Sequence, residues 1–287
     1  MKSLIINADD LGADETRNAG IFEGIQAGIV TSASILPNGP GLSDALNRIR
    51  SGSFNHVSWG VHLNLSEGEP VSNGNSLLLG PHGMFWGKVS SRRLLMRQGD
   101  RDLETEIVQE IDAQITLLET SGISLSHLDG HQHVHVFPAV LRAVLGAAQR
   151  HHIPWIRIPS EPEPTSSDFL LPSPLNEEAR SFSGLGQTAR SIILESGLHT
   201  TDHFRGLYLK GCLSIQVLES VLRWLPDGLT ELMVHPGRVV ANLPETPFSN
   251  FSTVEREKEL ETLLNARLRL ILSEMKIILT PFPETPD

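Results

Sequence analysis

The chain has 287 residues, which is enough for one large domain or two small ones. Its net charge of −11 at pH 7 makes it a poor general binder of nucleic acid or of anionic membrane surfaces, because both depend on Lys and Arg. Cys212 is the only cysteine, so intrachain disulfides, cysteine-based zinc fingers and iron–sulfur clusters are excluded.

Short apolar runs alternate along the chain with segments of helical periodicity. The runs predicted to be strands are Leu4–Ile6, Ser32–Leu36, Val57–Leu65, Leu125–Leu128, Trp155–Ile158, Thr230–Val234 and Ile277–Thr280. Apolar residues spaced three or four apart predict helices around 107–118, 140–147, 215–225 and 260–264. The alternation favours an α/β fold with a mostly parallel sheet, in one barrel-like domain spanning 1–287. A doubly wound open sheet is the alternative.

The ends and loops of this pattern carry further expectations. The first apolar run is too short, and turns acidic too early, for a secretory signal, and no stretch is long enough to span a membrane. We therefore expect a cytoplasmic protein. Loop insertions are predicted around 66–102 and 159–186, the first rich in glycine and the second in proline. Long loops in a compact domain often cover a substrate, although the second could equally be a surface insertion.

The most informative segment is a cluster of histidines. Alternate positions hold His127, Asp129, His131, His133 and His135. In an extended chain these side chains would point to one side. Imidazole is a common ligand of transition metals, so the cluster predicts a metal site, whereas a single histidine would more simply be a core residue. About three ligands suffice for a catalytic ion, so other members are expected to orient ligands or contact a substrate.

Three further strand ends deliver residues that could do chemistry. Asp9 and Asp10 directly follow the first predicted strand, and neighbours in an extended chain point opposite ways, so the two carboxylates can have different tasks. Their alternative role is a turn or a helix cap. His62 lies near the end of a strand, and His235 follows an apolar run and precedes Pro-Gly. Arg157 stands between apolar residues and is expected to pair with a carboxylate.

These motifs resemble those of a known family. The segments Asn7–Gly12, Gly60–Leu65, His127–Pro138 and Met233–Gly237 are similar, in this order, to the motifs of the YdjC-like carbohydrate deacetylases, which include the chitooligosaccharide deacetylases. The resemblance extends from Leu4 to about Thr280. It implies a deformed (β/α) barrel, similar to that of NodB-type polysaccharide deacetylases, and the removal of acetyl groups from N-acetylated sugars or oligosaccharides with one divalent metal ion.

The resemblance also implies roles for individual residues. Asp10, His62 and His131 would be the metal ligands, and Asp9 the general base for a metal-activated water.

The other candidate residues are expected to protonate the leaving group, to orient the base or to contact the substrate. We expect His235, rather than His133, to protonate the leaving amine, and Arg157 to hold Asp9 charged and aligned. Asp129, His133 and His135 are expected to contact the substrate.

Several points stay open at the level of sequence. An Asp with two His suits zinc or cobalt, whereas members of the family are commonly described with magnesium. The expected ion is therefore Mg or Zn. Another metal hydrolase such as a phosphoesterase, and a non-catalytic sugar-binding relative, are the alternative functions. The sequence does not determine the oligomeric state, and a homodimer is one option.

Overall fold

The protein is built on one parallel sheet, seen in a computed structural model that describes residues 1–74, 76–164, 173–239, 248 and 254–283. Its strands are β1 (Lys2–Leu11), β2 (Ser32–Ile35), β3 (Ser58–Leu63), β4 (Leu125–Gly130), β5 (Trp155–Ile156), β6 (His203–Arg205), β7 (Gly228–Val234) and β8 (Ile277–Leu279). Seven of these eight strands of the described residues were predicted from apolar runs. The exception is β6, which has only three residues, two of them charged or polar.

The strand order gives a curved sheet that nearly closes into a ring. The order is β5-β4-β3-β2-β1-β7-β6, and every pairing is parallel. One isolated bridge between Trp155 and His199 links β5 to the segment before β6. Strand β8 pairs with the first residues of β1, on the side where β2 pairs further along. This arrangement confirms the expected deformed (β/α) barrel and removes the open doubly wound sheet.

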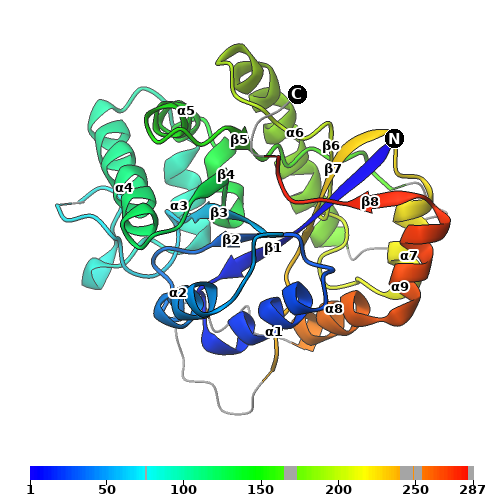
Figure 1. Cartoon of the computed structure of the whole chain (residues 1–287). Coiled ribbons are helices and arrows are strands. Elements are labelled where there is room, and N and C mark those ends of the chain that lie inside the picture. The colour runs from blue at the N-terminus through cyan, green and yellow to red at the C-terminus, as the bar shows by residue number, and fades with distance from the viewer. Residues whose placement is uncertain (75, 165–172, 240–247, 249–253, 284–287) are drawn as a thin grey trace.

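Helices lie around the outside of the sheet (Figure 1). They are α1 (Glu15–Gln26), α2 (Leu42–Ser51), α3 (Lys88–Leu95), α4 (Arg101–Thr120), α5 (Leu141–Arg150), α6 (Ser173–Glu195), α7 (Ile215–Arg223), α8 (Val254–Leu264) and α9 (Ala266–Glu274), with short 3₁₀ turns η1 (Pro81–Gly83) and η2 (His131–Val136). The four predicted helices correspond to α4, α5, α7 and α8. No helix in the described part of the chain is long and apolar enough to cross a lipid bilayer.

The two predicted loop insertions are not wholly irregular. The first contains η1 and α3 and reaches the start of α4, and the second contains the first half of α6. Residues 75 and 165–172 of these segments lie outside the described residues. A parallel sheet brings the carboxyl ends of its strands to one edge, which is where barrel enzymes place their sites. The polar strand ends singled out from the sequence therefore meet there.

Candidate functional site

A pocket lies at the edge of the sheet where the strands end, and a bulge in β1 presents two adjacent carboxylates to it. The register between β1 and β2 shifts between Ala8 and Leu11, and Asp10 adopts a left-handed backbone with φ 67°. Bulges re-aim side chains, and Asp tolerates this backbone better than most residues. Asp9 and Asp10 both line the pocket, so their side chains do not point to opposite sides as predicted for an extended chain. The two carboxylates differ instead in the side chains that each one contacts.

Asp10 forms a compact buried cluster with two histidines. His62 Nε2 lies 3.3 Å and His131 Nδ1 2.9 Å from the same oxygen, Asp10 Oδ1. One ligand atom from each of the three residues lies within 4.8 Å of the others. One carboxylate and two imidazoles are a donor set that suits a divalent transition metal. These residues could therefore hold such an ion.

The neighbours of the cluster orient its members. His62 Nδ1 donates to Asp129 Oδ1 at 2.7 Å, which leaves Nε2 facing Asp10. Histidines that bind metals commonly donate their second N–H to a carboxylate in this way. His131 Nε2 lies 2.9 Å from Glu67 Oε2. Asp129 is fully buried and does not line the pocket, so it touches the site through His62 rather than through a substrate.

Arg157 connects three buried carboxylates. Its Nη1 and Nη2 donate to the two oxygens of Asp9, each at 2.7 Å, and Nη2 also lies 2.7 Å from Asp129 Oδ2. Its Nε donates to Glu231 Oε1 at 2.7 Å. Removing one partner from such a network leaves uncompensated buried charge, which typically costs about 3–5 kcal/mol. The structure thus places Arg157 against Asp9, as the sequence suggested, and adds Glu231.

His235 lies on the other side of Asp9. Its Nε2 is 4.0 Å from Asp9 Oδ2, and its Nδ1 is 4.0 Å from Glu259 Oε2 on α8. The backbone N–H of His235 donates to the same Glu259 oxygen at 2.6 Å. The side chain is 12% exposed, so it is partly buried at the pocket wall and open to a ligand.

The histidine segment is not a single extended strand. Strand β4 ends at Gly130, and His131 opens the turn η2, in which Gln132 and His133 both have φ 54°. The expected alternation therefore stops at His131. His133 reaches the pocket, where its ring packs 4.7 Å from that of Phe182.

The two ends of the segment are structural. His127 stacks on Phe282 with ring centroids 4.1 Å apart, as a satisfied core histidine does. His135 is fully buried, does not line the pocket, and its Nε2 lies 3.1 Å from the carbonyl oxygen of Arg157. Direct contact of His135 or Asp129 with a substrate would require the surrounding chain to open.

The charges of the site favour a cation at its centre. Burial lowers the pKa of His62, but the charges of Asp129 and Asp9 outweigh this and raise that pKa to about 10. Although burial acts to raise it, the pKa of Asp10 is held well below its usual value by His131 and His62. A proton on His62 and a bound divalent cation would both interact favourably with these carboxylates.

In two outer carboxyls, burial outweighs the effect of the neighbouring charges on the pKa. It raises the pKa of Glu231 and of Glu259 to about 7, against the opposing charges of Arg157 and Arg256 respectively.

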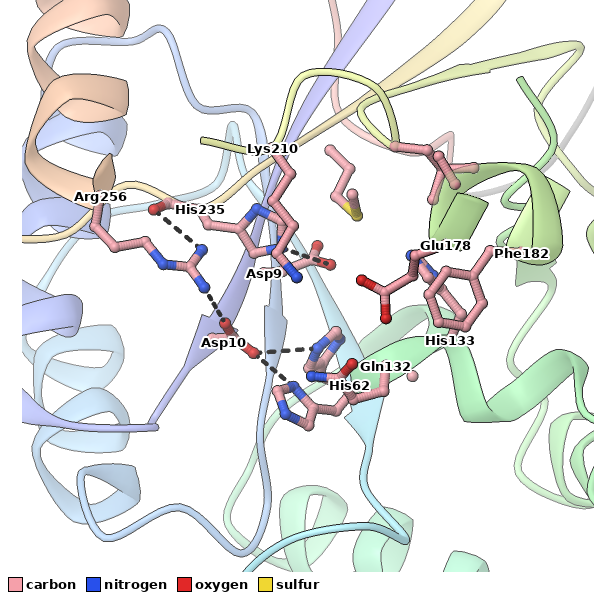
Figure 2. A pocket seen from close by; sticks show the side chains of 15 residues that line it. Asp9, Asp10, His62, Gln132, His133, Glu178, Phe182, Lys210, His235 and Arg256 are labelled. Carbon is pink, nitrogen blue, oxygen red and sulfur yellow. Dashed lines mark hydrogen bonds and ion pairs between the residues drawn. The ribbon is translucent and has the colours of Figure 1, made fainter. Parts of the chain in front are cut away.

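The pocket brings these groups together with residues that the sequence did not single out. Figure 2 shows Asp9, Asp10, His62 and His235 facing a cavity that Glu178, Phe182, Lys210 and Arg256 also line. The missed neighbours of the predicted residues are Arg17, Glu67, Glu231, Arg256 and Glu259. Only Glu231 had a signal, because it is a charged residue inside a predicted buried strand.

Comparison with solved structures supports the fold. The chain is similar to the crystal structure of an Enterococcus faecalis V583 protein named for cellobiose-phosphate cleavage, with a TM-score of 0.73 and 24% sequence identity. The match covers 98% of this chain and 97% of that one. At this identity the likeness shows a shared fold.

Comparison of sequences identifies the family. A protein of Mus musculus named carbohydrate deacetylase is 36% identical over 94% of this chain and 91% of its own length. A protein of Halalkalibacterium halodurans with the same name is 29% identical over 92% of this chain and 96% of its own length. The model of the family described as YdjC-like protein matches residues 3–274. The chain therefore belongs to the YdjC-like family.

Proposed function

We propose that this chain is a metal-dependent carbohydrate deacetylase, which hydrolyses the acetamide of an N-acetylated sugar or oligosaccharide. The observation that carries the proposal is the cluster of Asp10, His62 and His131 facing the same pocket as Asp9 and His235. The relatives named carbohydrate deacetylase, each matched over nine tenths of this chain, support the reaction class.

Asp10, His62 and His131 would hold one divalent metal ion, either Mg or Zn. When bound, the ion supplies a Lewis acid that activates water and stabilises negative charge on the acetamide oxygen. Asp129 keeps His62 oriented by the 2.7 Å bond to its Nδ1. An Asp with two His is closer to the ligand preference of zinc than to that of magnesium.

Asp9 is proposed as the general base. The two donors of Arg157 fix both of its oxygens, so the carboxylate cannot rotate away from the pocket. Asp9 accepts the proton of the attacking water while the oxygen of that water forms a bond to the acetyl carbon. Glu231 and Asp129 hold the guanidinium in turn and are positioning residues.

His235 is proposed as the general acid. The leaving group is an amine, which must be protonated as its bond to the acetyl carbon breaks. His235 stands at the wall of the pocket across from the histidine pair, with Glu259 behind it. His133 is less suited, because its ring packs among Phe182 and Phe204 and its Nδ1 has no hydrogen-bond partner among the described residues. We keep His133 as a substrate contact.

A phosphoesterase with two ions is disfavoured by Arg157. Asp9, His62 and Asp129 form a second group of three close ligand atoms, as a two-metal site would need. The guanidinium of Arg157 already lies 2.7 Å from both carboxylates of that group. Because this cation compensates their charge, a second divalent ion would have to displace a buried arginine.

The proposal is tested by measuring acetate release from N,N′-diacetylchitobiose. Chelator-treated protein should be inactive, and Zn²⁺ or Mg²⁺ should restore acetate release without any release of phosphate from p-nitrophenyl phosphate. His62→Ala and His131→Ala should each lose bound metal, measured by elemental analysis, while circular dichroism stays native. Wild-type protein that binds metal stoichiometrically but releases acetate from no N-acetylated sugar would overturn the proposal.

The location and assembly of the protein remain predictions. The cytoplasmic location expected from the sequence would be tested by cell fractionation, and a homodimer by sedimentation of the purified protein.

A further inference from the structure

One wall of the pocket has no part in the proposed chemistry. This wall is formed by Glu178 and Phe182 of helix α6 and by Leu207 and Lys210 of the turn that follows β6. Figure 2 shows the side chains of Glu178 and Lys210 reaching into the cavity from these two elements. Neither element supplies a candidate metal ligand, base or acid.

The charged ends of this wall have unused hydrogen-bonding capacity. Glu178 Oε1 pairs with Lys88 at 2.7 Å, and among the described residues Glu178 Oε2 has no hydrogen-bond partner. Lys210 is half-buried, and within the same part of the chain its ammonium makes neither a hydrogen bond nor an ion pair. Burial lowers the pKa of Lys210, with Lys88 acting in the same direction and Glu178 against it. A partly buried ammonium that lacks a hydrogen-bond partner favours binding of a ligand that supplies a hydrogen-bond acceptor.

The two groups have complementary hydrogen-bonding chemistry. An ammonium only donates, and an ionised carboxylate only accepts. A sugar hydroxyl does both, so adjacent hydroxyls of one ring can donate to Glu178 and accept from Lys210. Phe182 and Leu207 give the same wall an apolar surface, which suits the C–H face of a sugar ring.

We infer that Glu178 and Lys210 form the specificity-determining contact of the pocket and bind hydroxyl groups of the sugar ring that carries the acetamide. This assignment rests on the proposed deacetylase function. It places recognition of the ring on α6 and on the turn after β6, away from the strand ends that do the chemistry. The pair therefore acts on binding of the substrate more than on the rate of the bound complex.

The test is the effect of Lys210→Met and Glu178→Gln on KM and kcat for N,N′-diacetylchitobiose. Hydrogen bonds to charged groups predict a rise in KM of about 10- to 100-fold for each variant, with kcat within about threefold of wild type and metal content unchanged. Lys258→Met on α8 and Glu177→Gln on α6 remove the same charges from exposed positions and are the matched controls.

Monodeoxy analogues of the substrate identify the contact. The analogue that lacks the hydroxyl bound by Lys210 should be a poor substrate for wild type, and Lys210→Met should lose nothing further with that analogue. Equal KM values for wild type and both variants, or full additivity of variant and deoxy effects at every hydroxyl, would overturn the inference.

Titration calorimetry with the same disaccharide separates this inference from the proposed function. If wild type binds the sugar but releases no acetate, the proposed deacetylase function is refuted. The change in Kd for the two variants would still decide whether Glu178 and Lys210 bind the sugar. Wild type that neither binds nor hydrolyses the sugar would refute both. Loss of metal in Lys210→Met would also refute the inference, because the residue would then act on the metal cluster.

Discussion

At the scale of single residues, the two carboxylates of one dipeptide have different partners, in keeping with the two tasks proposed for them. Asp10 faces His62 and His131, and Asp9 faces Arg157 and His235. The bulge in β1 lets both side chains reach one pocket from adjacent positions. The difference between them therefore lies in their partners, and substitution of each should have a different consequence.

Asp9→Asn should abolish most turnover while leaving metal bound. The amide keeps the shape and one hydrogen-bonding oxygen but cannot accept a proton at neutral pH, so kcat should fall about 10²- to 10⁴-fold. Asp10→Asn should instead weaken metal affinity, and excess metal should restore part of the activity. The measurements are metal content and acetate release across a metal titration. Rescue of Asp9→Asn by metal would show that the roles are exchanged.

The sequence predicted the polar strand ends but not how they are connected. Asp and His at the ends of β1, β3, β4 and β7 are visible in the sequence because polar residues that follow buried strands are unusual. Their partners Arg17 and Glu259 come from α1 and α8, where a charged residue looks like any solvated helix position. Neither residue type nor spacing reveals that such a side chain is buried, since burial depends on which helix covers that edge of the sheet.

At the scale of elements, β3 and β4 pack so closely that one glycine is required. Gly60 pairs with His127 across the two strands, and a Cβ added to Gly60 would lie 2.3 Å from the ring of His127. That ring is stacked on Phe282 and cannot easily retreat. The core histidine, the glycine and the strand pairing are thus one packing unit.

Gly60→Ala should destabilise the protein by about 1–3 kcal/mol, because overpacking forces the ring or the backbone to shift. The free energy of unfolding in urea measures this loss. Gly184→Ala on α6 is the control, since a Cβ there meets nothing within 4 Å and alanine favours a helix by about 0.5–1 kcal/mol. Equal unfolding free energies for Gly60→Ala and wild type would mean that His127 is free to move.

The sequence predicted four helices of clear periodicity, but it missed the long helices α1 and α6 as well as some short or strained elements. Strand β7 has a run of apolar residues, whereas β6 is His203–Arg205 and holds its place by pairing with β7. The turn η2 departs from the expected strand because Gln132 and His133 take a left-handed backbone, which neither residue type signals. Tertiary contacts override local preference at these two places.

At the scale of the whole molecule, a buried carboxyl couples stability to pH. Glu161 accepts the backbone N–H groups of Gly206, Leu207 and Tyr208 at 3.0, 2.8 and 3.4 Å. Burial nevertheless raises its pKa to about 7, despite these bonds and the charge of Arg205. The folded protein therefore binds this proton more tightly than the unfolded chain, in which the pKa is near 4.5.

Stability should consequently fall as pH rises from about 4.5 to about 7, and Glu161 should contribute up to roughly 3 kcal/mol of that fall at 1.36 kcal/mol per unit. Glu161→Gln should flatten the dependence over this window. Urea unfolding at pH 5, 6, 7 and 8 measures the difference between the two proteins, and Glu261→Gln at an exposed site of α8 is the control. Parallel profiles for wild type and Glu161→Gln would show that Glu161 does not change its protonation on folding.

Binding of the metal should stabilise the whole fold, because the cluster draws its ligands from three strand ends that separate on unfolding. An ion at 100 times its Kd adds about 2.7 kcal/mol to the free energy of unfolding, or roughly 5–10 °C in Tm for a chain of this size. Chelation of wild type should remove this gain, and Asp10→Asn should show little of it, whereas Glu261→Gln, which lies on the exposed surface, should retain it in full. Differential scanning calorimetry with and without Zn²⁺ or Mg²⁺ makes the comparison. A shift of the same size in Asp10→Asn would place the stabilising ion elsewhere, and the assignment of Asp10, His62 and His131 would then fail irrespective of any activity measurement.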